Sequence, residues 1–420
     1  MEMSSRTILH IDFDSFFASA EQQYNPLLRK RPIGVTATNG RTCVIASSRE
    51  AKRKGVKTGS RTQDAVRLCS DIIFVPADFV KYWEISKKFI TICQDFSPLV
   101  EVFSIDELFM DVTESVHLFG NVDNLIALLK KRIATEIGEF ITVSVGVSTN
   151  KILAKLASGL KKPNGVCVIS DKNLEEIYKN AVLQDICGIG PRIEARLIRM
   201  GILTLLQLRK TSLSYLVAEF GNVEGNFLYN VGQGKDVRPV VAFTRAPDVK
   251  SVGRQYCLPH NEHNERVVMQ NVYELYEEVA LKLRRLNKKA RSCGLSLYGS
   301  YTLYGHITQQ EYVDSGYDLF QMGMKVVERE YSSFPPGYVR RIGVWVSYLE
   351  DKSHLSLPLF PEARRKEKII SIRDTINDTF GNHTIRNGFL YRAAKLTTVP
   401  NGFMSDRVER TKLAQSFAKS

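Results

Sequence analysis

The segment FSIDELFMD, residues 103–111, places two neighbouring carboxylates inside an apolar stretch that is typical of a buried strand. Burial of an unpaired charge is costly, so Asp106 and Glu107 need a specific reason to be there. Successive side chains of a strand point to opposite faces, and the two acids therefore converge only where a strand ends or turns. The pattern predicts two short strands joined by a turn at residues 104–107.

A second pair of acids lies near the N-terminus, in the segment HIDFD of residues 10–14. A period of two puts Asp12 and Asp14 on one face of a strand. No Lys or Arg within residues 100–111 neutralises the other pair. Two Mg²⁺ ions about 4 Å apart would balance such charges and stabilise the attacking and leaving oxygens of phosphoryl transfer. Acids near strand ends also commonly cap turns, so a purely structural role stays open at this point.

The composition points to a polyanionic partner. The 420 residues carry a net charge of +13 at pH 7, which favours nucleic acid first and an anionic membrane surface second. No apolar run is long enough to span a bilayer, and the N-terminus lacks the pattern of a signal peptide. The seven cysteines are scattered singly, which indicates reduced thiols in a cytosolic protein.

The order of periodic segments predicts several domains of the α+β class. The first region reads β-α-(insert)-α-β-β-α-β-α, which suits one central sheet with helices packed on one face. Residues 29–67 form a basic, Gly-rich insert with a short strand and two helices. Residues 232–250 lack any period and read as a linker. The region after it reads β-α-β-β-α-β, a small α+β sandwich.

A helix-hairpin-helix is indicated by CGIGPRIEARLIRMGI, residues 187–202. In such a motif a glycine turn lets backbone N–H groups approach a DNA phosphate closely, and here Leu197 is expected to face inward. Gly188, Gly190 and Arg192 are the candidate DNA contacts. An ordinary helical turn remains the alternative interpretation.

Four segments together resemble the Y-family translesion DNA polymerases, of the DinB or polymerase IV type with some features of the polymerase V catalytic subunit. They are HIDFDSFFASAE (10–21), NPLLRKRPIGV (25–35), EVFSIDELFMDVT (101–113) and VSVGVSTNKILAKLASGLKKPNG (143–165). The resemblance covers about residues 6–350 and implies a right-hand-like polymerase. Its expected parts are a palm (1–23 and 77–166), fingers (24–76), a helical thumb with the helix-hairpin-helix (167–235), a linker (236–247), an α+β little finger (248–349) and a tail (350–420).

The resemblance assigns the acids. Asp12, Asp106 and Glu107 match the family's catalytic, metal-binding carboxylates, and the backbone carbonyl of Phe13 completes the ligand set. They would hold two Mg²⁺, or Mn²⁺ in substitution, between the primer 3′-hydroxyl and the α-phosphate of a dNTP. Asp111 matches no catalytic position and is expected to be structural.

The resemblance also implies a nucleotide pocket. Phe17 matches the steric gate, an aromatic ring that excludes ribonucleotides, although Phe16 is an equally placed aromatic residue and either ring suits an ordinary helix core. Lys162 matches a lysine that reaches the triphosphate. Arg49 and Lys52 stand where many relatives have Tyr and Arg, and a guanidinium would bind a phosphate with bidentate geometry. A solvated basic helix face is the alternative for these two residues.

The tail contains the segment LSLPLF, which resembles the peptide that binds the bacterial sliding clamp, with His354 in place of the usual Gln. An extended segment of this kind places apolar anchors in a pocket. The anchors would be Leu355, Leu357, Leu359 and Phe360. From Ile369 onward the sequence shows a helix-like pattern. We expect this extension to dock on the catalytic core or to bind another repair protein.

The resulting hypothesis is a low-fidelity, template-directed polymerase that copies damaged DNA by two-metal nucleotidyl transfer. We expect no proofreading exonuclease, because no segment of the sequence is left for such a domain. The expected partners are primer-template DNA, dNTP, the sliding clamp and repair proteins, and the protein is expected to be a cytoplasmic, nucleoid-associated monomer. A nucleotidyl cyclase-like two-metal enzyme and a non-catalytic accessory protein that binds DNA and clamp are the alternatives.

Overall fold

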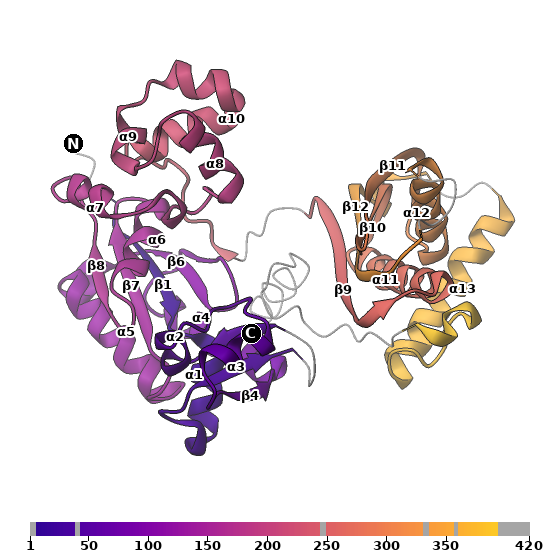
Figure 1. The fold of residues 1–420 in the computed structure, drawn as a ribbon, viewed down its shortest axis with the longest axis horizontal. Coiled ribbons are helices and arrows are strands. Elements are labelled where there is room, and N and C mark those ends of the chain that lie inside the picture. Colours follow the sequence, from indigo (N-terminus) through magenta and orange to yellow (C-terminus); the bar gives the residue numbers. More distant parts are fainter. Residues whose placement is uncertain (1–5, 38–42, 244–248, 331–335, 357–359, 394–420) are drawn as a thin grey trace. The chain divides into compact units, whose positions relative to one another are not determined.

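The computed structural model describes residues 6–37, 43–243, 249–330, 336–356 and 360–393 (Figure 1). These residues divide into two compact units, residues 6–243 and residues 249–393. Within the described residues, no helix combines the length and the apolar character that a membrane crossing needs.

The first unit is built on a five-stranded sheet of order β5-β6-β1-β7-β8. Its strands are β1 (Ile8–Phe13), β5 (Val100–Val102), β6 (Glu107–Asp111), β7 (Val143–Ser148) and β8 (Val166–Val168). The helices that follow these strands are α1 (Phe16–Tyr24), α4 (Phe79–Gln94), α5 (Val122–Glu136) and α6 (Lys151–Leu160). The short strands β5 and β6 flank a turn, as the sequence predicts.

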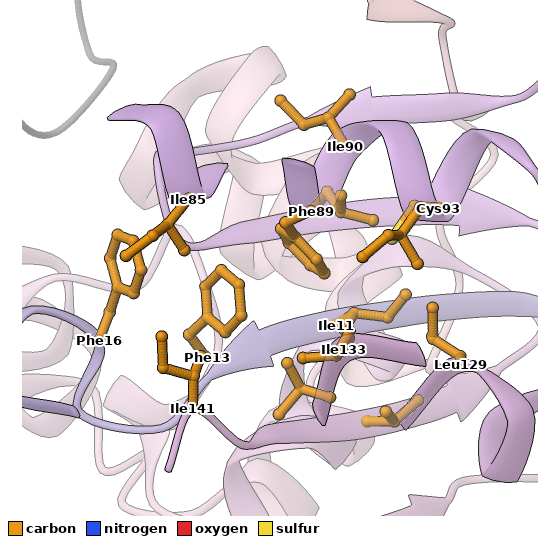
Figure 2. Close-up of a cluster of buried hydrophobic side chains, with 14 of the residues drawn as sticks. Ile11, Phe13, Phe16, Ile85, Phe89, Ile90, Cys93, Leu129, Ile133 and Ile141 are labelled. Atoms are coloured by element: carbon orange, nitrogen blue, oxygen red, sulfur yellow. The ribbon is translucent and has the colours of Figure 1, made fainter. Parts of the chain in front are cut away.

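One face of this sheet packs on α4 and α5 and forms the largest core. Leu9, Ile11 and Phe13 alternate along β1 and are all buried in that core. Figure 2 shows Phe13 between Phe16 and Phe89, with ring centroids 4.7 Å and 4.4 Å away. The end of β1 and the start of α1 are therefore fixed by aromatic packing.

The opposite face of the sheet carries α6, so the expectation of helices on one face only is wrong. Ala154 of α6 is buried in a second cluster with Ile8 of β1 and Phe109 of β6. The close approach depends on Gly146 of β7, where an added Cβ would lie 2.0 Å from the carbonyl oxygen of Ala154. The hydrophobic period alone does not say that two faces are covered, because β1 reads as an almost continuous apolar run.

The basic insert forms a three-stranded sheet of order β3-β2-β4. It consists of β2 (Ile33–Thr36), β3 (Val44–Ser47), α2 (Arg49–Arg53), α3 (Thr62–Leu68) and β4 (Ile73–Pro76). The predicted strand and the two predicted helices are present. The sequence interpretation missed β2 and β4.

Residues 174–232 form a helical part whose core is continued by apolar residues of α6 and β8. It contains α7 (Leu174–Asn180), α8 (Pro191–Arg199), α9 (Leu205–Lys210) and α10 (Leu213–Gly232). Leu197 is fully buried, as predicted. Gly188 has φ +112°, and a Cβ there would lie 2.6 Å from the ring of Phe227, so the turn before α8 requires glycine.

The second unit is a four-stranded antiparallel sheet of order β11-β10-β12-β9 covered by helices, which confirms the β-α-β-β-α-β prediction. Its elements are β9 (Ser251–Glu262), α11 (Glu265–Arg285), β10 (Lys288–Gly299), β11 (Thr302–Val313), α12 (Gly316–Glu330) and β12 (Val339–Asp351). The tail adds α13 (Pro361–Phe380), which docks on this unit through ion pairs to α11, α12 and β10. Short 3₁₀ segments are η1 (Pro26–Leu28), η2 (Val116–Phe119), η3 (Leu183–Asp185), η5 (Lys352–His354) and η6 (Gly388–Arg392).

The packing of α6 on β7 gives a testable prediction. Gly146→Ala should lower the free energy of unfolding by about 1–3 kcal/mol, because the new methyl group would clash with the α6 backbone. The matched control is Gly159→Ala in α6, where an added Cβ meets nothing within 4 Å and alanine favours the helix. Urea denaturation of the two variants measures the difference. An unchanged midpoint for Gly146→Ala would contradict the close contact.

Candidate active site

Three carboxylates from two distant parts of the sequence, Asp12 and the neighbours Asp106 and Glu107, lie at one end of the five-stranded sheet. Strands β1 and β6 pair antiparallel with Asp12 directly opposite Glu107. The backbone N–H of Phe13 donates to the carbonyl of Asp106 (2.9 Å), which holds the turn before β6 against β1. The side chain of Ser104 hydrogen-bonds Asp106 within that turn. Both acids therefore lie at a strand end, where Asp106 lines a cavity beside Asp12 and Glu107 lies close to Asp12 and His10.

Side-chain cations from α6 and the turn after it approach these acids. The Nε2 atom of His10 lies 3.0 Å from Oε2 of Glu107, and the Nζ atom of Lys155 pairs with the same oxygen. The Nζ atom of Lys162 pairs with Oδ1 of Asp12. Sequence reasoning missed the roles of His10 and Lys155. The only signal was that His10 shares a strand face with Asp12.

The surroundings shift the pKa values of the three carboxyl groups in different directions. Burial raises the pKa of Asp12, although Lys162 opposes the shift, and burial also raises the pKa of Asp106. Burial alone would raise the pKa of Glu107 as well, but the hydrogen bond from His10 and the charge of Lys155 lower it to about 2. Glu107 is therefore ionised over the whole physiological range, whereas the other two carboxyls gain from a further cation.

His10 is fixed from both sides. Its pKa is lowered by burial, and its Nδ1 atom lies 2.7 Å from the hydroxyl of Ser158 on α6. That hydroxyl also donates to the carbonyl of Lys155 (2.8 Å). The helix thus positions both groups that hold the Glu107 carboxylate.

Asp14 is not part of this cluster, and the prediction that it shares a strand face with Asp12 is wrong, because β1 ends at Phe13 and Asp14 lies in the turn that follows. Its carboxylate accepts hydrogen bonds from Thr142 (2.6 Å), Ser144 (2.7 Å) and the backbone N–H of Asn164 (2.7 Å). Asp111 likewise accepts from the backbone and hydroxyl of Thr113, as expected for a structural residue.

A cavity of about 220 Å³ opens beside the carboxylates and brings most of the predicted nucleotide contacts together. It is lined by Asp12, Phe13, Phe16, Phe17, Lys52, Asp106 and Lys162 from the predicted set, and by Ser15, Ile45, Ala46, Ser47, Thr58 and Ile105. Sequence reasoning missed the hydroxyl groups of Ser15, Ser47 and Thr58. Ser15 adopts φ 53°, a left-handed conformation that is uncommon for a residue other than glycine.

Arg49 lies apart from this lining. Its guanidinium hydrogen-bonds the hydroxyl of Thr142 and lies 3.7 Å from the carboxylate of Asp14. Lys52, one helical turn later, does line the cavity, and burial together with the charge of Lys162 lowers its pKa.

Phe16 and Phe17 are both buried and both border the cavity, so burial alone does not distinguish them. Phe16 stacks on Phe13 in the core of the sheet (Figure 2). Phe17 stacks on Tyr82, with ring centroids 4.3 Å apart and planes 12° from parallel.

The donor set fits divalent metal ions. Ligand atoms of His10, Asp12 and Glu107 lie within 4.8 Å of one another, and Asp106 faces the same cavity as Asp12. Carboxylate oxygens are the ligands that hard divalent cations prefer. The raised pKa values of Asp12 and Asp106 indicate that side-chain cations compensate their charge incompletely.

The other candidate contacts lie in separate places. Gly190 and Arg192 stand at the N-terminus of α8, with Arg192 exposed, and Gly188 forms the turn before it. In the tail, Phe360 is exposed immediately before α13 and Leu355 follows η5. The other two predicted clamp anchors, Leu357 and Leu359, lie outside the described residues.

Three stretches of the chain match known protein families. Residues 11–159 match the impB/mucB/samB family, and residues 249–359 match the C-terminal domain of that family. Residues 184–236, which contain α8, match the family described as DNA polymerase-iota, thumb domain.

Similar proteins cover nearly the whole chain. DNA polymerase IV of Pelotomaculum thermopropionicum is 33% identical over 95% of this chain and 97% of its own length. DNA polymerase IV of Bacteroides fragilis is 34% identical over 82% of this chain and 93% of its own. A solved Y-family DNA polymerase chimera of Dbh and Dpo4 has a TM-score of 0.69 and 28% identity, covering 82% of this chain and 99% of that one. The chain therefore belongs to the Y family of DNA polymerases.

Proposed function

We propose that this protein is a DNA-directed DNA polymerase that copies damaged templates without proofreading, in the manner of DNA polymerase IV. The observation that carries the proposal is a cavity lined by Asp12 and Asp106 together with three aromatic rings and two lysines, with Glu107 directly opposite Asp12 in the strand register. Such a site suits transfer of a nucleotide from a dNTP to a primer 3′-hydroxyl.

Asp12, Asp106 and Glu107, with the carbonyl of Phe13, would hold two Mg²⁺, or Mn²⁺ in their place. Bound there, these ions would supply charge stabilisation to the attacking 3′-hydroxyl and the leaving pyrophosphate. His10 and Lys155 keep the Glu107 carboxylate ionised and fix its orientation. This preorganisation is worth most in a site from which water is largely excluded.

The lysines of the cavity would bind the triphosphate. Lys162 would exchange its pairing with Asp12 for a phosphate oxygen as nucleotide and metal enter together. Lys52, on the opposite wall, would bind a second phosphate oxygen. Arg49 would reach the triphosphate only by leaving Thr142 and Asp14. The ring of Phe17 would lie against the 2′ position of the sugar and act as the steric gate, with Phe16 packed behind it.

DNA contacts would come from the turn before α8, where Gly188 and Gly190 let backbone N–H groups approach a phosphate and Arg192 adds its charge. The segment Leu355–Phe360 would tether the polymerase to the sliding clamp. We further propose a monomer that works on the bacterial nucleoid in the cytoplasm. Neither rival function is favoured: a cyclase has no need of a DNA-binding hairpin, and an accessory homologue has no need of intact carboxylates.

The catalytic assignment is tested by Asp106→Asn, which keeps the shape of the side chain and removes its charge. Primer extension with Mg²⁺ should fall by at least about 1,000-fold, because the ion between the substrates would lose a ligand. The matched control is Asp111→Asn on β6, which should retain most activity since its acceptor role toward Thr113 persists. Full activity of Asp106→Asn would exclude the proposed mechanism.

The gate assignment is tested by comparing Phe17→Ala with Phe16→Ala. The first should raise ribonucleotide incorporation about 100-fold while dNTP incorporation changes little, because space opens beside the 2′-hydroxyl. The second should chiefly destabilise the fold, since Phe16 stacks on Phe13. Single-nucleotide insertion with dNTP and rNTP measures the ratio, and a higher ratio for Phe16→Ala would move the gate to that residue.

Lys162→Met should have opposite effects on metal and nucleotide. Without nucleotide, the affinity for Mn²⁺ should rise several-fold, because the ammonium group no longer competes for Asp12. The KM for dNTP should rise about tenfold through loss of a phosphate contact. Electron paramagnetic resonance titration and primer extension measure the two quantities, with the exposed neighbour Lys161→Met as control. A fall in both affinities would show that the pairing with Asp12 is not competitive.

A further inference from the structure

The proposed clamp segment is anchored at both ends. On its N-terminal side, η5 is fixed to the second unit: the backbone N–H of Lys352 donates to Asn287 (2.9 Å), and its Nζ lies 2.6 Å from Asp314. Leu355 follows at once. On its C-terminal side, Phe360 is the residue before α13, with no linker between them. A clamp bound to this segment would therefore meet the second unit at a restricted angle.

Helix α13 docks on this unit with its charged side. Its ion pairs join Lys366 to Asp318 (2.6 Å), Glu367 to Lys289 (2.6 Å), Arg373 to Glu277 (2.9 Å), Asp374 to Arg284 (2.5 Å) and Asp378 to Arg285 (2.7 Å). None of the described α13 side chains is fully buried. The helix is thus held by ion pairs rather than by burial of an apolar stripe.

Three large apolar residues of α13 are exposed, whereas Ile370 and Ile376 are half-buried. Ile369, Ile372 and Phe380 are 57%, 50% and 74% exposed, and their spacing puts them on one side of a helix of 3.6 residues per turn. Arg365 and Lys368 lie along the same side and form no ion pair with any described residue. We call these five residues the outer face of α13. An amphipathic helix normally buries its apolar residues, so the exposure of these three is unusual.

A hollow deepens the outer face near its start. Ile369 and Arg365 border an open cavity of about 380 Å³ between α13 and the rest of the second unit, whose walls also include Tyr317 and the ion pair of Arg373 with Glu277. Walls that combine tyrosine and isoleucine side chains with charged groups suit an apolar side chain of a partner that has an acidic neighbour.

The outer face lies close to the clamp segment by covalent geometry. At a rise of about 1.5 Å per residue, Lys368 follows Phe360 by about 12 Å along the helix axis and Ile372 by about 18 Å. A protein that binds Phe360 in a pocket therefore has its surface beside the first turns of α13. The charged side of the helix is covered by α11, α12 and β10, so only the outer face is available to that protein.

We propose that the sliding clamp binds the outer face of α13 as a second contact beside the Leu355–Phe360 segment, through an acidic surface with apolar side chains. The inference rests on the clamp binding proposed above. Two other occupants fit less well. A second copy of the chain would bring the same basic residues, and residues 394–420 carry five basic against two acidic side chains, so like charges would meet. The two contacts together would fix the orientation of the little finger on the clamp.

The test measures the Kd of the full-length protein for its purified sliding clamp by surface plasmon resonance. Ile372→Asp should weaken binding about tenfold, because it puts a negative charge opposite an acidic, apolar surface. The matched control is Ser371→Asp, an exposed neighbour that lies off the outer face and should leave the Kd unchanged. Lys368→Gln should weaken binding and reduce its salt dependence. Primer extension without clamp should be the same in all three variants.

Phe360→Ala separates the two proposals. This substitution should abolish clamp binding. If it has no effect on the Kd, the proposal that this segment tethers the clamp is rejected, and the proposal of a second contact is rejected with it. If Phe360→Ala abolishes binding while Ile372→Asp matches Ser371→Asp, the segment binds clamp alone and the second contact is overturned. Sedimentation of the polymerase without clamp supplies a further check, because a wild-type dimer that Ile372→Asp dissociates would make the outer face a contact between copies and overturn the proposal.

Discussion

The register between β1 and β6 is the constraint on which the site depends. It sets Asp12 opposite Glu107, and a slip of one residue would turn Asp12 toward the hydrophobic core. Leu9 and Ile11 oppose such a slip, because both are buried on the other face and their exposure would cost several kcal/mol in total, at about 1.5–3 kcal/mol each. The apolar side of the strand thus positions the acidic side. The acids therefore come together only after the sheet has formed.

Helix α6 is the second half of the same arrangement. A cluster of buried carboxylates is tolerated only with compensating charge, and α6 supplies Lys155 while Ser158 holds His10 in place. Gly146 permits the helix to lie close enough for these contacts. Glu107 is compensated by side chains, whereas Asp12 and Asp106 keep raised pKa values. The cluster is therefore divided into one acid that the protein fixes and two that favour added cations.

The sequence predicts local features well and side-chain partners poorly. The turn within FSIDELFMD follows from alternation and apolar content, and the inward position of Leu197 follows from helical period. The pairing of Lys162 with Asp12 does not follow, because it depends on how α6 and the turn after it lie across the sheet. Residues 100–111 contain no cation, so the sequence suggested that metal alone balances the acids, while the compensating lysine of Glu107 comes from another element.

The orientation of α13 is a second feature that the sequence pattern does not predict. Its isoleucine period predicts a helix correctly, and the usual rule would place that stripe against the protein. The structure places charged residues there instead, since α11 presents Glu277, Arg284 and Arg285 rather than an apolar groove. The exposed ion pairs among the five each contribute little, about 0–1 kcal/mol, whereas Arg284–Asp374 and Arg373–Glu277 are partly buried. A helix held this way leaves apolar side chains in contact with water. The unfavourable free energy of that exposure is offset only where another surface covers them.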